Sequence, residues 1–176
     1  VNAMVALVSD SQDSLPLLNV VVVGHTNTGK TSLIRTMLRS TQFGMVEDAA
    51  GTTRHVEQAT LSAHNQPILN VYDTPGLEDS RALYYHIKHL QAKSKSTLPV
   101  QILRDFVANI TIDDPLEQEA KVIRQVLRSD ILLYIIDVRE PFLEKYRLEL
   151  EILTQAARPI IPIFNFTAEN PQALAT

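Results

Sequence analysis

The chain has 176 residues, of which 45% are hydrophobic and 20% charged, with a net charge of −4 and no cysteine. This balance excludes disordered and collagen-like chains, gives no electrostatic attraction to nucleic acid, and removes disulfide, thiol-catalytic and zinc–thiolate chemistry. Its five glycines are too few for a turn-dense all-β domain, so we expect one helix-rich globular domain.

Residues 1–18 are expected to precede the domain, as a vector-derived scar at residues 1–3 and a loosely ordered lead-in. No secretory signal is present, and the longest apolar runs, Val20–Val23 and Ile131–Ile136, are too short to form a transmembrane segment. We therefore expect a cytoplasmic location, with membrane association only through parts outside this chain.

Apolar strands alternate with amphipathic helices over residues 19–167, the expected domain. Strands are expected at 19–23, 55–63, 68–72, 131–137 and 160–166, and helices at 30–39, 81–92, 100–110, 114–128 and 141–157. The alternation predicts a three-layer α/β fold with a mostly parallel sheet, and the hairpin at 55–72 supplies one antiparallel strand. The stretch between Leu77 and Leu116 is longer than a single helix needs to connect two parallel strands. An insertion is therefore expected at about 93–114.

Two prolines mark element boundaries. Asp114 followed by Pro115 predicts a helix capped at that aspartate. Pro162 cannot donate to a central ladder, so the last strand is either an edge strand or pairs only after Pro162.

The segment from Gly24 to Thr31 matches G-x-x-x-x-G-K-[ST] in full, between an apolar strand and an amphipathic helix. Backbone N–H groups of such a loop surround phosphates, and its glycines let the backbone approach closely. Lys30 would place its charge on the terminal phosphates, and Thr31 would offer a hydroxyl to Mg²⁺. The nucleotide-binding residues predicted from the motifs are Gly24, His25, Thr26, Asn27, Thr28, Gly29, Lys30, Thr31, Ser32 and Gly76.

Two further segments add to this loop. Asp73-Thr74-Pro75-Gly76 follows a strand, where the carboxylate can hold the Mg²⁺ shell and the Gly76 N–H can meet a γ-phosphate. Gly51-Thr52-Thr53-Arg54 lies on a loop whose hydroxyls can cap Mg²⁺ while γ-phosphate is bound. Alone, each segment could be an ordinary turn or loop, but in this order they indicate a nucleotide switch. The predicted metal ligands are Thr31, Thr52, Thr53 and Asp73.

Together these segments resemble the translation-factor-related GTPases, in the branch that contains TrmE, Era, EngA and septin-like proteins. That branch shows Asn-x-Gly-Lys in its phosphate loop and Gly-Thr-Thr-Arg in its first switch. The chain also resembles bacterial GTPases that carry a C-terminal domain of unknown function. The segments that carry this second resemblance are Val21–Thr31, Asp73–Asp79, Glu117–Val122 and Pro162–Phe166.

The resemblance implies a P-loop NTPase fold that lacks its last strand and helix, with residues 168–176 beginning a truncated continuation. It implies GTP and GDP as ligands, Mg²⁺ as cofactor, and slow hydrolysis of GTP to GDP and phosphate. In several relatives the asparagine at the position of Asn27 helps to bind K⁺ near the phosphates. The resemblance therefore implies that Asn27 acts in catalysis, together with Lys30 and Thr53. A nucleotide-dependent homodimer and an attached C-terminal domain are the implied partners, and nucleic acid is not expected.

Two departures from the family pattern leave an alternative open. Leu77 stands where many GTPases have a water-orienting glutamine, and Asn165-Phe166-Thr167-Ala168 stands where they have Asn-Lys-x-Asp. The resemblance implies that Asn165, which matches the asparagine, is a nucleotide-binding residue, whereas the lysine and the aspartate are absent. Loss of the aspartate acceptor should weaken selection of guanine over adenine. The alternative is thus a nucleotide-binding regulatory module with negligible hydrolysis or relaxed guanine specificity, whereas a P-loop kinase is disfavoured.

Overall fold

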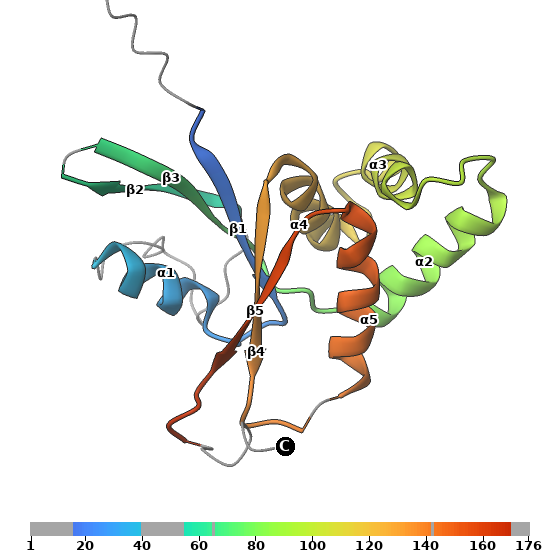
Figure 1. The fold of residues 1–176 in the computed structure, drawn as a ribbon. Coiled ribbons are helices and arrows are strands. Elements are labelled where there is room, and N and C mark those ends of the chain that lie inside the picture. Colours follow the sequence, from blue (N-terminus) through green and yellow to red (C-terminus); the bar gives the residue numbers. More distant parts are fainter. Residues whose placement is uncertain (1–15, 40–54, 65, 142, 170–176) are drawn as a thin grey trace, which may run out of the picture.

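The computed structural model describes residues 16–39, 55–64, 66–141 and 143–169. Within them, one sheet of five strands has helices on both faces (Figure 1). The strands are β1 (Leu18–Gly24), β2 (Glu57–Ala63), β3 (Gln66–Asp73), β4 (Ile131–Asp137) and β5 (Ile160–Asn165). The helices are α1 (Lys30–Leu38), α2 (Ser80–Lys93), α3 (Pro99–Asn109), α4 (Glu117–Arg128) and α5 (Glu144–Leu153), and the short 3-10 helix η1 (Thr154–Ala156) follows α5.

The sheet has the order β2-β3-β1-β4-β5, so β1 lies at its centre. β1 pairs in parallel with β3 and β4, β5 pairs in parallel with β4, and β2 pairs antiparallel with β3. Both faces of β1 are covered, which explains why Val20–Val23 is an uninterrupted apolar run and is buried. The predicted α/β class, mostly parallel with one antiparallel strand, is confirmed.

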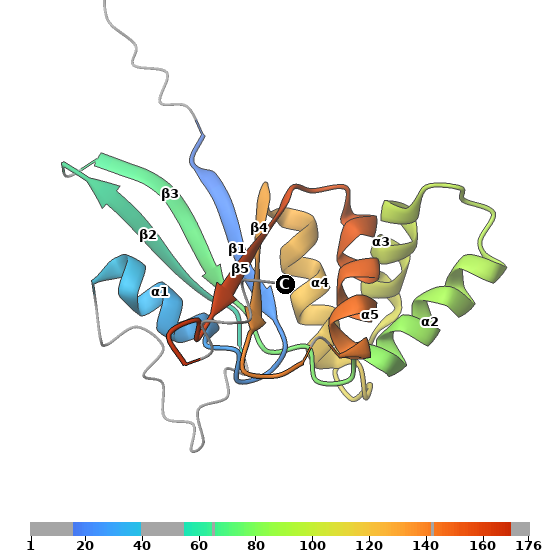
Figure 2. The ribbon, with the colours of Figure 1, turned by 60° about the horizontal axis from the view of Figure 1, so that its bottom comes forward.

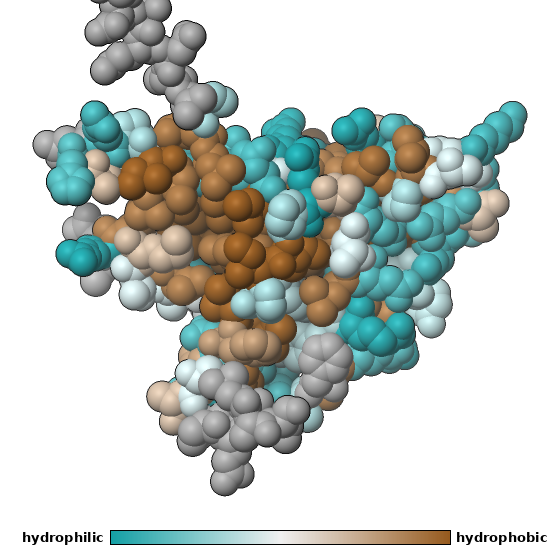
Figure 3. Space-filling model, in the orientation of Figure 1, coloured by the Kyte–Doolittle hydropathy of each residue, from teal (hydrophilic) through white to brown (hydrophobic). Residues whose placement is uncertain are grey.

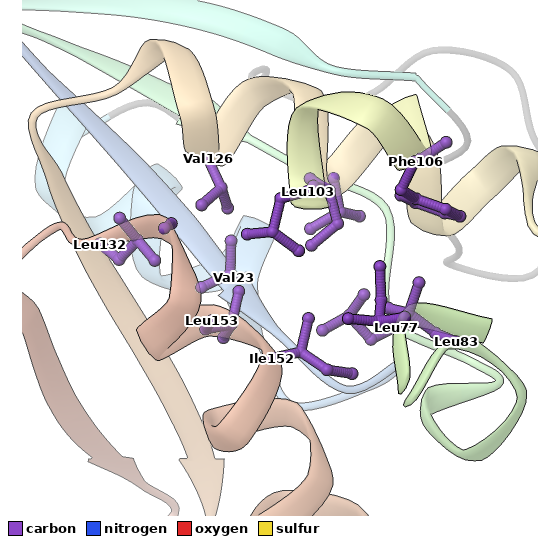
Figure 4. Packing of buried hydrophobic residues seen from close by; sticks show 14 of the residues in the cluster. Val23, Leu77, Leu83, Leu103, Phe106, Val126, Leu132, Ile152 and Leu153 are labelled. Carbon is purple, nitrogen blue, oxygen red and sulfur yellow. The ribbon is translucent and has the colours of Figure 1, made fainter. Parts of the chain in front are cut away.

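Two apolar clusters, one on each face, hold the layers together. α1 covers one face, where Ile34 packs with Val22 and Ile135. α4 and α5 lie on the other face, and α2 and α3 lie outside them (Figure 2). Val23 and Ile152 belong to this larger cluster (Figure 4). Burying one such side chain fully contributes about 1.5–3 kcal/mol, so these clusters fix the loops at the sheet's end.

Three helices connect β3 to β4, where a parallel crossover needs one. α2 packs against α5 and α3, while α3 packs against α4 and η1. α3 lies inside the stretch at about 93–114 where extra residues were expected. The arrangement brings the start of α4 beside the start of α2, since Glu119 accepts hydrogen bonds from the backbone there.

Two predicted helix starts were wrong by a few residues. α4 begins at Glu117, because the Asp114 side chain accepts from the nearby Leu116 N–H at 2.8 Å and closes a turn before the helix. α5 begins at Glu144 rather than at Pro141. It ends at Leu153, since its last turn tightens into η1 before Ala157 adopts a left-handed conformation at φ 52°.

The Pro162 conflict is resolved because β5 is an edge strand among the described residues. Leu132 N donates to Pro159 O, and Val138 N donates to Asn165 O. The odd-numbered residues along β5 therefore turn their backbone N–H and C=O groups toward β4. The Pro162 nitrogen therefore faces away from β4, and no ladder bond is lost.

Apolar side chains also reach the surface around the strands (Figure 3). On β5, Ile161 is 44% and Phe164 50% exposed. Among the described helices, none has the length and apolar character needed to span a membrane.

Candidate phosphate-binding site

The loop between β1 and α1 has the backbone of a phosphate cradle. A Cβ on Gly24 would lie 2.7 Å from the Ile135 carbonyl oxygen, so only glycine fits between β1 and β4. Gly29 has a φ of 88° and stands at the N-cap of α1, where it makes no side-chain cap. Asn27 is also left-handed, at φ 63°, and exposed. No side chain therefore caps the start of α1, and the helix dipole favours an anion there.

Lys30 lies inside this cradle rather than in solvent. Its Nζ donates to Gly24 O at 3.2 Å and to His25 O at 2.7 Å, and the side chain is buried. Burial lowers the pKa of Lys30 from 10.5 to about 8, although the carboxylates of Asp73, Glu149 and Glu78 oppose that shift. A buried ammonium group held on two carbonyls is a site that a phosphate oxygen can take over.

Thr31 and Asp73 meet at the end of the cradle. The Thr31 hydroxyl donates to Asp73 Oδ2 at 2.5 Å, whereas Asp73 Oδ1 is buried and has no hydrogen-bond partner within the described ranges. Burial is the main cause that raises the pKa of the Asp73 carboxyl above 3.8. An orphaned carboxylate oxygen beside a hydroxyl is a donor set suited to a hard divalent cation, so these residues fit Mg²⁺.

The segment after β3 closes against the cradle. Leu77 N donates to Gly24 O at 3.2 Å, and a Cβ on Gly76 would lie 2.6 Å from Thr26 Cα. The Thr74 hydroxyl anchors the segment on Val22 O at 2.7 Å. Gly76 is therefore the residue through which this segment touches the phosphate loop.

The side chains of Leu77 and Glu78 point in different directions. Leu77 is fully buried and belongs to the same apolar cluster as Leu83 and Ile152 (Figure 4). Glu78 is exposed, and its carboxylate accepts from Thr26 Oγ1 at 3.4 Å. The residue in the place of the usual glutamine thus faces the core, whereas its neighbour faces the phosphate loop.

The far end of β5 reaches the same loop. Asn165 Nδ2 donates to Thr28 O at 2.9 Å, across 137 positions of sequence. Phe166 has a φ of 63°, and the Arg139 guanidinium lies 3.6 Å from its ring centroid. Arg139 is held by Asp137, with Nη2 donating to Oδ2 at 2.7 Å. Phe166 and Arg139 thus form a stacked pair beside the cradle, and no motif in the sequence pointed to Arg139.

A cavity of about 280 Å³ opens beside the phosphate loop. The side chains that line it are His25, Thr26, Asn27, Thr28, Asp137, Arg139, Glu140, Lys145 and Tyr146. It contains both acidic and basic groups, so it carries no uniform field for either sign of ligand.

Most of the predicted site residues come together around this loop. The loop residues, Asp73, Gly76 and Asn165 are in contact as described, and Ser32 is exposed on the first turn of α1. Thr52 and Thr53 lie outside the described residues.

Two buried carboxylates beside the site, Glu149 and Glu119, were not predicted from the sequence. Glu149 accepts from Ser80 and Tyr134, and Glu119 accepts from the backbone of Asp79. Each glutamate lies on the apolar face of its helix. An acidic residue at such a position is the sequence feature that could have identified it as a buried, hydrogen-bonded carboxylate.

The comparisons with known proteins agree with this geometry. The family model described as "50S ribosome-binding GTPase" matches residues 19–166. Immune-associated nucleotide-binding protein 10 of Arabidopsis thaliana is 43% identical over 67 residues, which are 38% of this chain and 14% of that protein. The tRNA modification GTPase MnmE of Staphylococcus haemolyticus is 28% identical over 120 residues, 68% of this chain and 25% of that protein. The chain thus spans a quarter or less of these relatives' length.

Two solved structures share the fold. Era in complex with MgGDPNP and nucleotides of 16S ribosomal RNA has a TM-score of 0.56 at 18% identity, over 90% of this chain and 43% of that one. An Aquifex aeolicus Era variant bound to GDP and AlF₄⁻ has a TM-score of 0.53 at 18% identity, over 89% of this chain and 44% of that one. With its family match over most of the described fold, the chain belongs to the 50S ribosome-binding GTPase family as a P-loop GTPase domain.

Proposed function

We propose that this domain is a nucleotide switch that binds GTP and GDP with Mg²⁺ and hydrolyses GTP slowly in the absence of a partner. The observation that carries the proposal is the junction of two separate segments at one point. The Thr31–Asp73 hydrogen bond and the contact of Gly76 with Thr26 place the end of β3 directly on the phosphate loop. Such a junction lets one segment respond to the phosphate bound by the other.

Each residue has a role in this proposal. Lys30 gives up its two carbonyl partners and binds the β- and γ-phosphates, and the uncapped start of α1 binds their oxygens. Thr31 and Asp73, with Thr52 or Thr53, hold Mg²⁺, which neutralises charge that builds on the phosphates. The Gly76 N–H meets the γ-phosphate. The remaining cradle residues, Gly24, His25, Thr26, Thr28, Gly29 and Ser32, complete the phosphate contacts.

We further propose that Asn27 helps to bind K⁺ near the phosphates. Asn27 is exposed, and its backbone is left-handed at φ 63°. A monovalent cation there would supply positive charge that an arginine finger supplies elsewhere. Asn27 would then act in catalysis together with Lys30 and Thr53.

A second candidate function is favoured by Leu77, which is fully buried and cannot orient an attacking water. In that case the domain binds nucleotide and regulates an attached C-terminal domain with negligible hydrolysis. Asn165 alone would read the base, since Ala168 offers no carboxylate, and the preference for guanine would be relaxed. For both candidate functions we propose a homodimer that forms in response to nucleotide. Both also include a cytoplasmic location and no binding of nucleic acid.

The test is phosphate release from GTP and from ATP in KCl and in NaCl, with binding of GDP and a non-hydrolysable GTP analogue measured by calorimetry. The proposal expects release from GTP, faster in KCl. Binding without release in either salt would leave only the regulatory module. Equal rates in the two salts would refute the role of Asn27, and no binding of any nucleotide would refute both candidate functions.

A further inference from the structure

Glu149 of α5 is a fully buried carboxylate that joins four parts of the fold. Its Oε1 accepts from the Ser80 hydroxyl at 2.7 Å and lies 3.0 Å from His25 Nδ1. Its Oε2 accepts from the Tyr134 hydroxyl at 2.7 Å. Ser80 is the first residue of α2, and His25 is in the phosphate loop. One oxygen atom therefore binds both the phosphate loop and the helix that follows the Gly76 segment.

Burying the carboxylate of Glu149 in the apolar interior costs free energy. Glu149 occupies the apolar side of α5 between Tyr146 and Ile152, where a leucine would pack without any need for partners. Because the carboxylate is buried, no water replaces a partner that moves away, and the charge loses one of the three hydrogen bonds that stabilise it in a low-dielectric interior. Movement of either His25 or Ser80 is thus penalised unless the other partner adjusts with it.

The segment between these partners is fastened a second time by α4. The Gln118 side chain donates to Gly76 O at 3.1 Å. Glu119, itself buried, accepts from the N–H groups of Glu78 at 3.2 Å and Asp79 at 3.0 Å. These bonds hold the Gly76–Ser80 segment onto α4. Glu149 differs from Gln118 and Glu119 because it also contacts a side chain of the phosphate loop, His25.

We propose that Glu149 is a positioning residue that couples the phosphate loop to the start of α2, so that the nucleotide bound by the loop sets the position of α2 and α3. The inference rests on the proposed function and deepens it, because it names the output of the switch. When phosphate displaces Lys30 from His25 O, the loop adjusts, and the shared oxygen passes that adjustment to Ser80. α2 packs on α5 and on α3, so a shift of α2 would reach α3 through their shared contact.

The test compares two variants that each remove one hydrogen bond from Glu149. Ser80→Ala removes a partner of Oε1 and cuts the link to α2, whereas Tyr134→Phe removes the partner of Oε2 and leaves the link intact. Both bonds are 2.7 Å long and buried, which makes them a matched pair. Hydrogen exchange of peptides from α2 and α3 is measured without nucleotide, with GDP and with a non-hydrolysable GTP analogue.

Couplings between sites usually amount to about 5- to 150-fold, so exchange in α2 and α3 should change at least about fivefold between GDP and the analogue. Tyr134→Phe should keep that change, and Ser80→Ala should lose it while analogue binding stays within about threefold of the unsubstituted protein. His25→Ala should lose it as well. If Ser80→Ala keeps the change, or both variants lose it equally, the coupling is refuted although the proposed function stands. If the unsubstituted protein binds no nucleotide, the proposed function fails and the coupling fails with it.

Discussion

Removal of the lysine that the phosphate loop is built around should make the nucleotide-free protein more stable. In Lys30→Met the buried ammonium group is replaced by an apolar side chain of similar length. Gly24 O keeps its bond from Leu77 N at 3.2 Å, and His25 O keeps its bond from the Thr28 hydroxyl at 2.9 Å. The substitution therefore leaves neither carbonyl without a donor.

The magnitude follows from the depressed pKa of Lys30. A fall from 10.5 to about 8 corresponds to roughly 3 kcal/mol of free energy spent on burying the charge. The loss of two Nζ hydrogen bonds, at about 0.5–1.5 kcal/mol each, offsets about 1–3 kcal/mol of the gain. We expect a net stabilisation of up to about 2 kcal/mol, or a rise in Tm of up to about 4–8 °C for a domain of this size.

The lowered pKa of Lys30 also makes the free energy of unfolding depend on pH. Below pH 8 the lysine is protonated in both the folded and the unfolded chain, so the full cost of the buried charge is present. Between pH 8 and 10.5 the folded protein loses this proton first, and the free energy of unfolding rises with pH. Above 10.5 the cost is gone, so the advantage of Lys30→Met should shrink across this window.

The assay is urea unfolding of nucleotide-free protein at a series of pH values, read as the difference between the two proteins. Calorimetry with GTP and GDP should show that Lys30→Met has lost binding. A variant less stable than the unsubstituted protein at pH 7, or a stability difference that does not change with pH, would refute the reasoning.

Three further outcomes are expected around the site. Gly76→Ala places a Cβ 2.6 Å from Thr26 Cα, so calorimetry should show a larger loss of affinity for a GTP analogue than for GDP, and overpacking should cost about 1–3 kcal/mol in unfolding experiments. Equal losses for both nucleotides would contradict a γ-phosphate contact. Asp73→Asn should weaken the Mg²⁺ dependence of nucleotide binding about tenfold in magnesium titrations; an unchanged dependence would remove Asp73 from the metal site. Phe166→Lys combined with Ala168→Asp should raise the ratio of GTP to ATP affinity at least about tenfold in competition binding, and an unchanged ratio would show that the base lies elsewhere.

The sequence was sufficient for features that depend on neighbouring residues. The run Val20–Val23 predicted a buried strand, and the motif with glycines at 24 and 29 predicted a loop between that strand and a helix; the structure has both. These features follow from side-chain size, alternation and backbone freedom within a few positions. The exact start of α4 did not follow, because the Asp114 side chain accepts from the Leu116 N–H and closes a turn instead of capping a helix that begins at Pro115.

Only the tertiary structure decided which distant side chains meet. His25 and Glu149 are separated by 124 positions and Ser80 and Glu149 by 69, and no local pattern connects them. The direction of Leu77 was equally hidden, since a leucine after Gly76 could face water or core until α2 and α5 packed around it. The sequence by itself determined a phosphate loop on an α/β sheet. The packing of α4 and α5 decided how that loop is held, because buried polar groups must find their partners wherever the fold brings them.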